Sequence, residues 1–307
     1  MDKVLVTGAT GLIGENLCKE LIMNGLEPIV LSRRKGKLTK YRTFEWDLQK
    51  EYIEESLFEE KIDAIIHLAG AGIADKRWTK ARKKTIIDSR VNGVKLLGKY
   101  IAKMPKENRP KHFISAAAIG IYGNAGTEWV DENSPINKDS DEFLVVSCVA
   151  WEAAAAICTD LGMRTALLRI GIVLAKEGGA LAKMLPSYKM RVGAYFGNGQ
   201  QYYSWVHWDD ICQMFLFLLE NKDLTGVFNG VSPNPVKNKD FASTIATALG
   251  HKALLLPVPE FALKLGMGEM AAIVTDSVRV APKRLVESGY KFKYPTLEPA
   301  LKEILMK

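Results

Sequence analysis

Cysteine and histidine are scarce in this sequence, and their scarcity argues against two kinds of site. The 307 residues include four cysteines and four histidines. The cysteines are far apart and form no C-x-x-C pair, so we expect neither a disulfide framework nor a zinc site. The histidines are equally dispersed, and we expect no metal site. Free thiols are typical of a reducing compartment, so we predict a cytoplasmic protein.

Long hydrophobic runs are also lacking. No uncharged apolar stretch approaches the length of a bilayer-spanning helix, and we expect no membrane segment. The first predicted strand begins at Lys3, so we expect no signal peptide. Hydrophobic residues make up 48% and charged residues 25% of the chain, which is ordinary for a globular protein with a large core.

Acidic residues are fewer than basic ones, 35 against 42, and the formal net charge is +7. The positive residues cluster at 33–37 and at 76–84. Apart from Trp78 no aromatic side chain is interleaved with them, and no nucleic-acid-binding motif accompanies them. We therefore expect no nucleic-acid partner. Solvated helix faces or a pocket for a phosphorylated small molecule would explain the charge.

What the sequence does contain is an alternation of short apolar runs with longer helical patterns, typical of βαβ units and a parallel sheet. We predict an α/β protein with a doubly wound parallel sheet and a smaller, mostly helical C-terminal substrate domain. The predicted nucleotide-binding domain comprises residues 1–170 and 204–232, and the C-terminal domain comprises 171–203 and 233–307. Predicted helices include 12–24, 79–104 and 144–161.

A glycine-rich turn opens the chain. In VLVTGATGLIGENL, Gly8, Gly11 and Gly14 follow a predicted strand and begin a predicted helix. The first glycine allows the turn, the second lets backbone N–H groups approach a pyrophosphate, and the third lets the helix pack on the sheet. The segment predicts a dinucleotide site whose contacts are Gly8, Thr10, Gly11, Leu12 and Ile13.

The end of the second predicted strand indicates which dinucleotide. Enzymes that prefer the unphosphorylated cofactor place an acid there, but this strand ends in Ser32-Arg33-Arg34. Arg33 can bind a 2′-phosphate with two hydrogen bonds and stack on adenine. We predict NADP(H) as the cofactor; a solvated basic loop is the alternative.

Two further strand ends fit a cofactor wall. Asp47 and Leu48 are expected to flank the adenine. The small residues of Leu68-Ala69-Gly70 allow close approach to the cofactor backbone.

With TGATGLIG, HLAG and SAAAIGIYG together, the chain resembles the extended short-chain dehydrogenase/reductase superfamily. Within it, the passages SRVNGVKLL, CVAWEAAA, SWVHWDDI and VAPKRLVESGYKF resemble the atypical YfcH-like "epimerase family" branch. The resemblance covers the whole chain. It implies a Rossmann-type domain, bound NADP(H), a C-terminal substrate domain and a homodimer. Ser115, in the third motif, is added as a cofactor contact.

The resemblance also points to residues that are missing. Relatives use a Ser, a Tyr and a Lys at the reacting carbon, the Tyr transferring a proton and the Lys lowering its pKa. Here Ala117 stands at the Ser position, Cys148 at the Tyr position and Glu152 at the Lys position. Cys148 is a weak catalytic candidate or a buried apolar residue. Glu152 is expected to accept hydrogen bonds from ribose hydroxyls, and it would raise the pKa of a nearby thiol.

Several other polar residues have two interpretations each. Arg90 is expected near the nicotinamide end or paired with Glu152, and Thr85 one turn earlier is a weaker cofactor candidate; both could instead decorate a basic helix. Tyr122 is the best surviving proton donor or a packed aromatic residue. Arg169 is a phosphate contact or a salt-bridge residue. The side chain of His207 either faces the cleft or is structural, and Asp209 and Asp210 are expected to cap a helix.

Two functions compete on these grounds. The first is an NADP(H)-dependent oxidoreductase or nucleotide-sugar epimerase-like enzyme acting on a small, anionic or sugar-like molecule. The second is a non-catalytic sensor of NADPH. Retained cleft-forming loops favour the enzyme, and the missing catalytic trio favours the sensor.

Overall fold

A parallel sheet forms the centre of the molecule. The structure is a computed structural model that describes residues 1–33 and 40–306. In that part of the chain the main sheet has eight strands in the order β13-β8-β6-β5-β1-β2-β3-β4, paired in parallel except for β3 and β4. Their bounds are β1 (Lys3–Thr7), β2 (Glu27–Ser32), β3 (Arg42–Asp47), β4 (Tyr52–Ile53), β5 (Ala64–His67), β6 (His112–Ala118), β8 (Arg164–Ile170) and β13 (Gly226–Gly230). The predicted doubly wound parallel sheet is confirmed.

The strand order reverses at β1, which pairs with β2 on one side and β5 on the other. In open α/β sheets such a reversal leaves a crevice beyond the carboxyl ends of the strands, where ligands bind. The glycine turn that follows β1 lies at this point.

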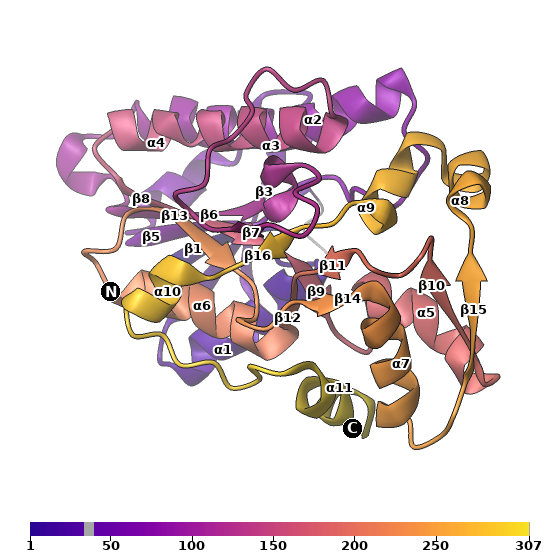
Figure 1. Ribbon diagram of the computed structural model, residues 1–307. Helices are drawn as coiled ribbons and strands as arrows, with labels where there is room; N and C mark the ends of the chain where they lie inside the picture. Colours follow the sequence, from indigo (N-terminus) through magenta and orange to yellow (C-terminus); the bar gives the residue numbers. More distant parts are fainter. Residues whose placement is uncertain (34–39, 307) are drawn as a thin grey trace.

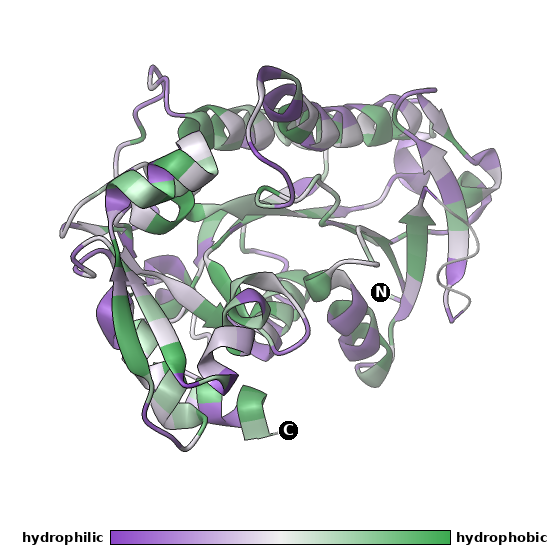
Figure 2. Cartoon of the chain, turned by 90° about the vertical axis from the view of Figure 1, so that its right-hand side faces the viewer, coloured by the Kyte–Doolittle hydropathy of each residue, from purple (hydrophilic) through white to green (hydrophobic). Residues whose placement is uncertain are grey.

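Helices cover both faces of the sheet (Figure 1). On one face lie α1 (Leu12–Met23) and α6 (Trp208–Glu220). On the other lie α2 (Lys80–Ile101), α3 (Phe143–Ala154) and α4 (Ala156–Asp160). Hydrophobic and hydrophilic residues alternate along these helices, as expected of helices with one buried face (Figure 2). The predicted helix at 144–161 is in fact two helices, which meet at Ala155.

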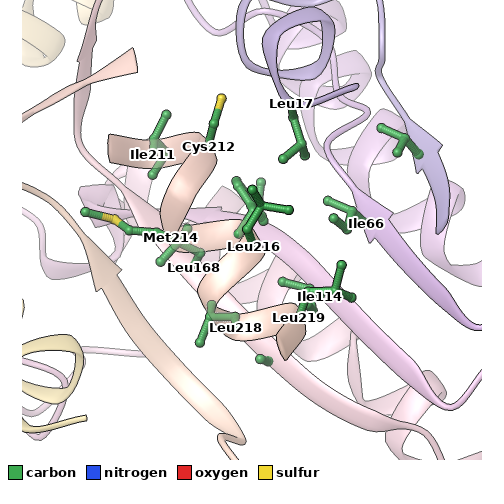
Figure 3. Close-up of a cluster of buried hydrophobic side chains, with 14 of the residues drawn as sticks. Leu17, Ile66, Ile114, Leu168, Ile211, Cys212, Met214, Leu216, Leu218 and Leu219 are labelled. Atoms are coloured by element: carbon green, nitrogen blue, oxygen red, sulfur yellow. The ribbon is translucent and has the colours of Figure 1, made fainter. Parts of the chain in front are cut away.

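The core under one face is built from α1, α6 and the strands of the main sheet that they cover. Figure 3 shows Leu17 of α1 near Ile66 of β5, with Leu216 and Leu219 of α6 beside Ile114 of β6. These side chains are at most 3% exposed. Burial of this apolar surface holds α1, and so the glycine turn before it, in a fixed position.

A second unit packs beside the carboxyl edge of the sheet. It contains α5 (Gly179–Lys189), α7 (Asn238–Ala248), α11 (Leu297–Met306) and the two-stranded parallel pair β10 (Val192–Phe196) and β15 (Leu254–Val258). Tyr188, Trp205, Phe241 and Leu301 form its core. Smaller pairs join it to the main sheet region: β9 (Ile172–Leu174) with β12 (Trp205–His207), and β11 (Tyr202–Tyr203) with β14 (Val236–Lys237).

The predicted assignment of all of 233–307 to the second unit is wrong for one segment. β16 (Arg279–Val280) pairs with β7 (Trp129–Val130), and α10 (Lys283–Glu287) follows it. Leu285 and Tyr290 belong to the main core. The segment returns because these apolar side chains are buried there, and because the Tyr290 hydroxyl bonds to Asp210.

One stretch passes the length and composition test for a membrane span. The window Phe143–Asp160 has a mean hydropathy of 1.6, and 44% of it is buried in the fold. A core helix passes the same test, and this window spans α3 and α4 against the sheet. It also contains Glu152, whose carboxylate is ion-paired inside the protein.

Candidate functional site

The glycine turn is pressed against the end of β5. Gly8 has a φ of +74°, and a Cβ there would lie 2.8 Å from the carbonyl carbon of Leu68. A Cβ on Gly14 would clash with the carbonyl oxygen of Gly8, so the helix packs on the turn as predicted. Gly11 is the N-cap of α1 and provides no side chain to accept from the first-turn N–H groups. The turn therefore presents bare backbone at a helix N-terminus, a favourable place for a phosphate.

A cavity of about 270 Å³, here called the glycine-turn cavity, opens beside this turn. It brings together nine predicted cofactor contacts: Gly8, Thr10, Gly11, Ser32, Arg33, Leu48, Leu68, Ala69 and Gly70. Thr85 of α2 completes its rim. These residues come from β1, β2, β5, α2 and the segment after β3, all at the carboxyl edge.

Asp47 lies just beyond the glycine-turn cavity. It lines an adjoining hollow together with Arg33, Leu48 and Thr85. Its Oδ1 accepts from the backbone N–H groups of Gln49 and Lys50 at 2.8 and 3.2 Å. One carboxylate oxygen therefore holds the turn after β3, and the other lies 3.9 Å from the Lys50 ammonium.

Three predicted cofactor contacts lie elsewhere. Leu12 and Ile13 do not line the glycine-turn cavity: Leu12 packs near Gly178, and Ile13 contacts the main core. Ser115 is 1% exposed, and its hydroxyl donates to the carbonyl of Ala116 at 2.9 Å. The hydroxyl of Ser115 is thus bonded within β6, and Ser115 as a cofactor contact stays a prediction. Arg34 lies outside the described residues.

Trp46 and Ser89 are among the wall residues that were not predicted. Trp46, on β3, lines the glycine-turn cavity and is only 3% exposed. Ser89, on α2, also lines it and accepts a hydrogen bond from the N–H of Ala71 at 2.9 Å. Because Trp46 directly precedes the predicted contact Asp47, the sequence could have indicated it as a wall residue. Nothing in the sequence distinguishes Ser89 from other serines on predicted helices.

Arg90 lies between this cavity and a second one. A Cβ on Gly70 would lie 3.2 Å from Cγ of Arg90, and the guanidinium donates to the carbonyls of Ala71 and Ile86 at 3.0 Å. The guanidinium also stacks over the ring of Trp151 at 4.7 Å. The predicted pairing of Arg90 with Glu152 is wrong, because backbone carbonyls and an aromatic face take up the cation.

The second cavity, here called the apolar cavity, has a volume of about 250 Å³. Its walls come from α2, α3, the end of β6, the β8–β9 junction, β11 and α9 (Ala272–Thr275). Ala118 lines this cavity, and Ala117, which the resemblance placed at the Ser position, does not. Neither side chain carries a hydroxyl.

Cys148 lines the apolar cavity and is 4% exposed. Burial, reinforced by Glu152 and opposed by Arg90, raises the pKa of its thiol to about 12. The thiol is therefore neutral near neutral pH, in keeping with the apolar interpretation. As a proton-transferring group it is poorly suited.

Glu152 is held by Arg169. Nε and Nη2 of Arg169 donate to the two carboxylate oxygens of Glu152 at 2.7 and 2.8 Å. Nη1 donates to the Tyr122 hydroxyl, which in turn donates to Oδ1 of Asn229 at 2.8 Å. None of Glu152, Arg169 and Tyr122 lines either cavity. The salt-bridge interpretation of Arg169 is confirmed, and the expected orientation of Tyr122 and Glu152 toward ligands is wrong.

Tyr122 is also a poor acid–base group. Burial raises its pKa, although Arg169 opposes the rise. Its hydroxyl already donates to Asn229 and accepts from Arg169 inside the protein.

His207 and the two aspartates serve the fold. His207 is fully buried, and its Nδ1 accepts from the N–H of Asp209, so His207 itself caps α6. The predicted capping by the aspartates is wrong. Asp210 accepts from the N–H groups of Lys293 and Tyr294, and Asp209 accepts from the Lys293 ammonium. In the described part of the chain, no group of three or more His, Cys, Asp or Glu side chains is arranged to hold a metal.

Comparison with known proteins places this geometry in context. A sequence model of the "NAD dependent epimerase/dehydratase family" matches residues 4–229. A model described only as a "domain of unknown function" (DUF1731) matches residues 258–304. The chain is 38% identical over 305 residues to the chloroplastic "Epimerase family protein SDR39U1 homolog" of Arabidopsis thaliana, covering 98% of this chain and 86% of that protein. It is 34% identical to "Epimerase family protein YfhF" of Bacillus subtilis, over 98% and 97% of the two chains.

Solved structures agree with these matches. The crystal structure of human epimerase family protein SDR39U1 (isoform 2) with NADPH is 32% identical, covers 99% of both chains and has a TM-score of 0.88. A nucleoside-diphosphate sugar epimerase from Corynebacterium glutamicum is 30% identical with a TM-score of 0.78; the match covers 99% of this chain and 58% of that one.

Proposed function

The chain belongs to the NAD dependent epimerase/dehydratase family, and from that premise we propose that it binds NADP(H) in the glycine-turn cavity. We further propose that it is an oxidoreductase-type enzyme acting on a small molecule in the adjoining apolar cavity. The single observation that carries the proposal is the cradle formed by Gly8 against Leu68 and Ala69, which only a residue without a Cβ can form. Such bare backbone beside a helix N-terminus suits a pyrophosphate.

The choice of NADP(H) over NAD(H) depends on the end of β2. Arg33 is exposed and lines both the glycine-turn cavity and the hollow beside Asp47. β2 itself ends at Ser32, without the acid that binds a free ribose 2′-hydroxyl. A guanidinium at this place supplies charge and paired donors for a 2′-phosphate. The human relative crystallised with NADPH supports the same choice.

When bound, NADP(H) would supply or accept a hydride at its nicotinamide ring. The chain's own residues would do the rest. The backbone of Gly8 to Leu12 and the side chain of Arg33 would bind phosphates, and Leu68 to Gly70 would set the approach of the cofactor to β5. Arg90, between the two cavities, would hold the boundary between cofactor and substrate.

A non-catalytic NADPH sensor is the second candidate, and one observation favours it. The groups that stand in the places of the proton-transferring pair are not available for proton transfer, because Cys148 is a buried neutral thiol and Glu152 is bound by Arg169. An apolar cavity beside the cofactor site favours the enzyme, because a sensor has no need of one.

The proposal is tested by titrating NADPH and NADH into the protein and following ligand binding by calorimetry. We expect tighter binding of NADPH, and we expect Arg33→Ala to remove most of that preference while leaving NADH affinity near its original value. Lys111→Ala, an exposed cation at the amino end of β6, is the matched control and should change neither. Equal affinity for both dinucleotides in the unaltered protein would contradict the choice of cofactor. NADPH binding without oxidation over a panel of carbonyl compounds would favour the sensor.

A further inference from the structure

The apolar cavity carries two charged side chains among its described lining residues, Arg90 and Asp276. Most of the remaining wall is apolar or aromatic, including Trp151, Tyr202 and Tyr203. A volume of about 250 Å³ lies at the low end for small-molecule sites, which are roughly 300–1,000 Å³ for drug-sized ligands. The cavity therefore suits a compact molecule with an apolar body, and the two charges decide what else it recognises.

Arg90 is partly engaged by the protein itself. Its Nη1 donates to the carbonyls of Ala71 and Ile86, and the guanidinium lies over the Trp151 ring. Burial lowers the pKa of Arg90. Lys183 donates to the carbonyl of Ala74 and does not line the cavity. A pyrophosphate-bearing substrate, such as a nucleoside diphosphate sugar, would therefore meet a single cation among the described lining residues, and that cation is already bonded on one side.

Asp276 is in the opposite situation. Within residues 1–33 and 40–306, no hydrogen bond or ion pair reaches its carboxylate, although the side chain lines the cavity. The chain around it is firmly anchored without that carboxylate. The Asp276 N–H donates to Ala272, the Ser277 N–H donates to Asn124, and the Ser277 hydroxyl bonds to the carbonyl of Gly126. The Asp276 carboxylate thus has no visible structural role.

A half-buried carboxylate without a partner is costly, because burial removes water from the charge and returns nothing. Such a carboxylate is typical of a binding site in which the ligand provides the missing partner. We propose that the apolar cavity binds a small molecule with an apolar body and a cationic amine, and that the Asp276 carboxylate is the group that receives the amine. This deepens the proposed function, on which it rests for the location of the substrate site.

The groups that face Asp276 set its charge state. Burial and the nearby Glu142 carboxylate, just before α3, raise the pKa of Asp276 to about 6. Across the cavity stand Arg90 on α2, the neutral Cys148 thiol on α3, and Tyr202 and Tyr203 on β11. The carboxylate is thus charged at pH 8 and largely protonated at about pH 5. An ammonium ligand should bind more tightly at the higher pH, since the ion pair exists only there.

The test uses benzylamine, benzyl alcohol and benzoate, three compounds of one shape that differ in charge. Their binding to the full chain is measured by ligand-detected NMR at about pH 8 and about pH 5, with and without NADPH. We expect benzylamine to bind best, about tenfold more tightly at the higher pH, and benzoate to bind least. Asp276→Asn should weaken benzylamine by about ten- to a hundredfold while sparing benzyl alcohol. Glu142→Gln should move the midpoint of the pH dependence to lower pH.

Asp139→Asn, on the exposed loop before α3, is the matched control and should leave all three affinities unchanged. Benzoate binding as tightly as benzylamine, or full benzylamine affinity in Asp276→Asn, would overturn the inference. So would the binding of none of the probes to a protein that binds NADPH normally. A failure of NADPH to bind, with amine selectivity intact, would instead overturn the proposed cofactor and leave the amine site standing.

Discussion

Arg169 on β8 holds the Glu152 carboxylate on α3 with two parallel hydrogen bonds, of 2.7 and 2.8 Å. The two side chains are only 6% and 13% exposed. The pair therefore joins a covering helix to the sheet, at the position that the resemblance to the superfamily predicts for a catalytic lysine. In this chain the position serves the fold, and the Tyr122 hydroxyl is bound into the same network.

Removing one partner of this pair should be severely destabilising. Arg169→Met leaves a buried carboxylate without a counter-ion and Tyr122 without a donor, so we expect the free energy of unfolding to fall by about 3–5 kcal/mol. The double change Arg169→Met with Glu152→Gln should cost less than the sum of the two single changes, because it leaves no unpaired charge. Urea denaturation measures all four proteins. Strictly additive losses would contradict the pairing.

The glycine turn gives a second prediction with a matched control. Gly8 and Gly25 both have a φ of +74°, but a Cβ at Gly8 would meet Leu68 and Ala69, whereas nothing lies within 4 Å of a Cβ at Gly25. Gly25→Ala should cost about 1 kcal/mol for its backbone conformation alone. Gly8→Ala should cost more and should also abolish NADPH binding, since the turn must move away from β5. Equal unfolding midpoints, with cofactor binding retained in both, would show that the close approach has no role.

The sequence predicted features that depend on local pattern. The glycine spacing, the parallel sheet and the long helix α2 each follow from residues within one stretch of chain, and the structure has them. The residues around the glycine-turn cavity were largely predictable too, because the carboxyl ends of neighbouring parallel strands necessarily meet at one edge.

Features that depend on partners from distant segments were not predictable. The sequence offered Arg90 as a partner for Glu152, and only the folded structure brings Arg169 of β8 to that carboxylate. The aspartates at 209 and 210 resemble helix caps, but the C-terminal segment at 290–294 supplies donors that claim them. No motif marked Asp276, because what distinguishes it is a cavity whose apolar walls come from several separate elements.

The cysteines should be unreactive in the folded protein. All four are buried, and burial raises the pKa of Cys18, Cys148 and Cys158 to about 12 and that of Cys212 further still. Thiolate is the reactive form, so Ellman's reagent at about pH 8 should label no thiol rapidly in the native state and all of them in urea. Rapid labelling of one thiol that disappears in Cys148→Ser would contradict the burial of Cys148 and revive it as a catalytic candidate.

His67, at the end of β5, should make the protein sensitive to acid. Its ring is fully buried, its Nδ1 forms a hydrogen bond with the Thr7 hydroxyl at 2.9 Å, and the ring packs edge-on against Trp46. Burial, reinforced by Arg90, lowers its pKa from 6.5 to about 4. The unfolded chain therefore takes up a proton at His67 between those values while the folded protein does not. The stability from this group is complete above about pH 6.5 and is lost as the pH falls toward 4, by about 3 kcal/mol.

His67→Leu should flatten this part of the pH dependence of the free energy of unfolding, whatever its effect on stability at neutral pH. Phe113→Leu is the matched control, because Phe113 stacks on the His67 ring and its truncation damages the same core without removing a titrating group. We expect Phe113→Leu to lower the whole curve and to keep its slope between pH 4 and 6.5. An unchanged slope in His67→Leu would mean that His67 can be protonated inside the fold. Protonation inside the fold would require water to reach the end of β5, and this would contradict the complete burial of His67.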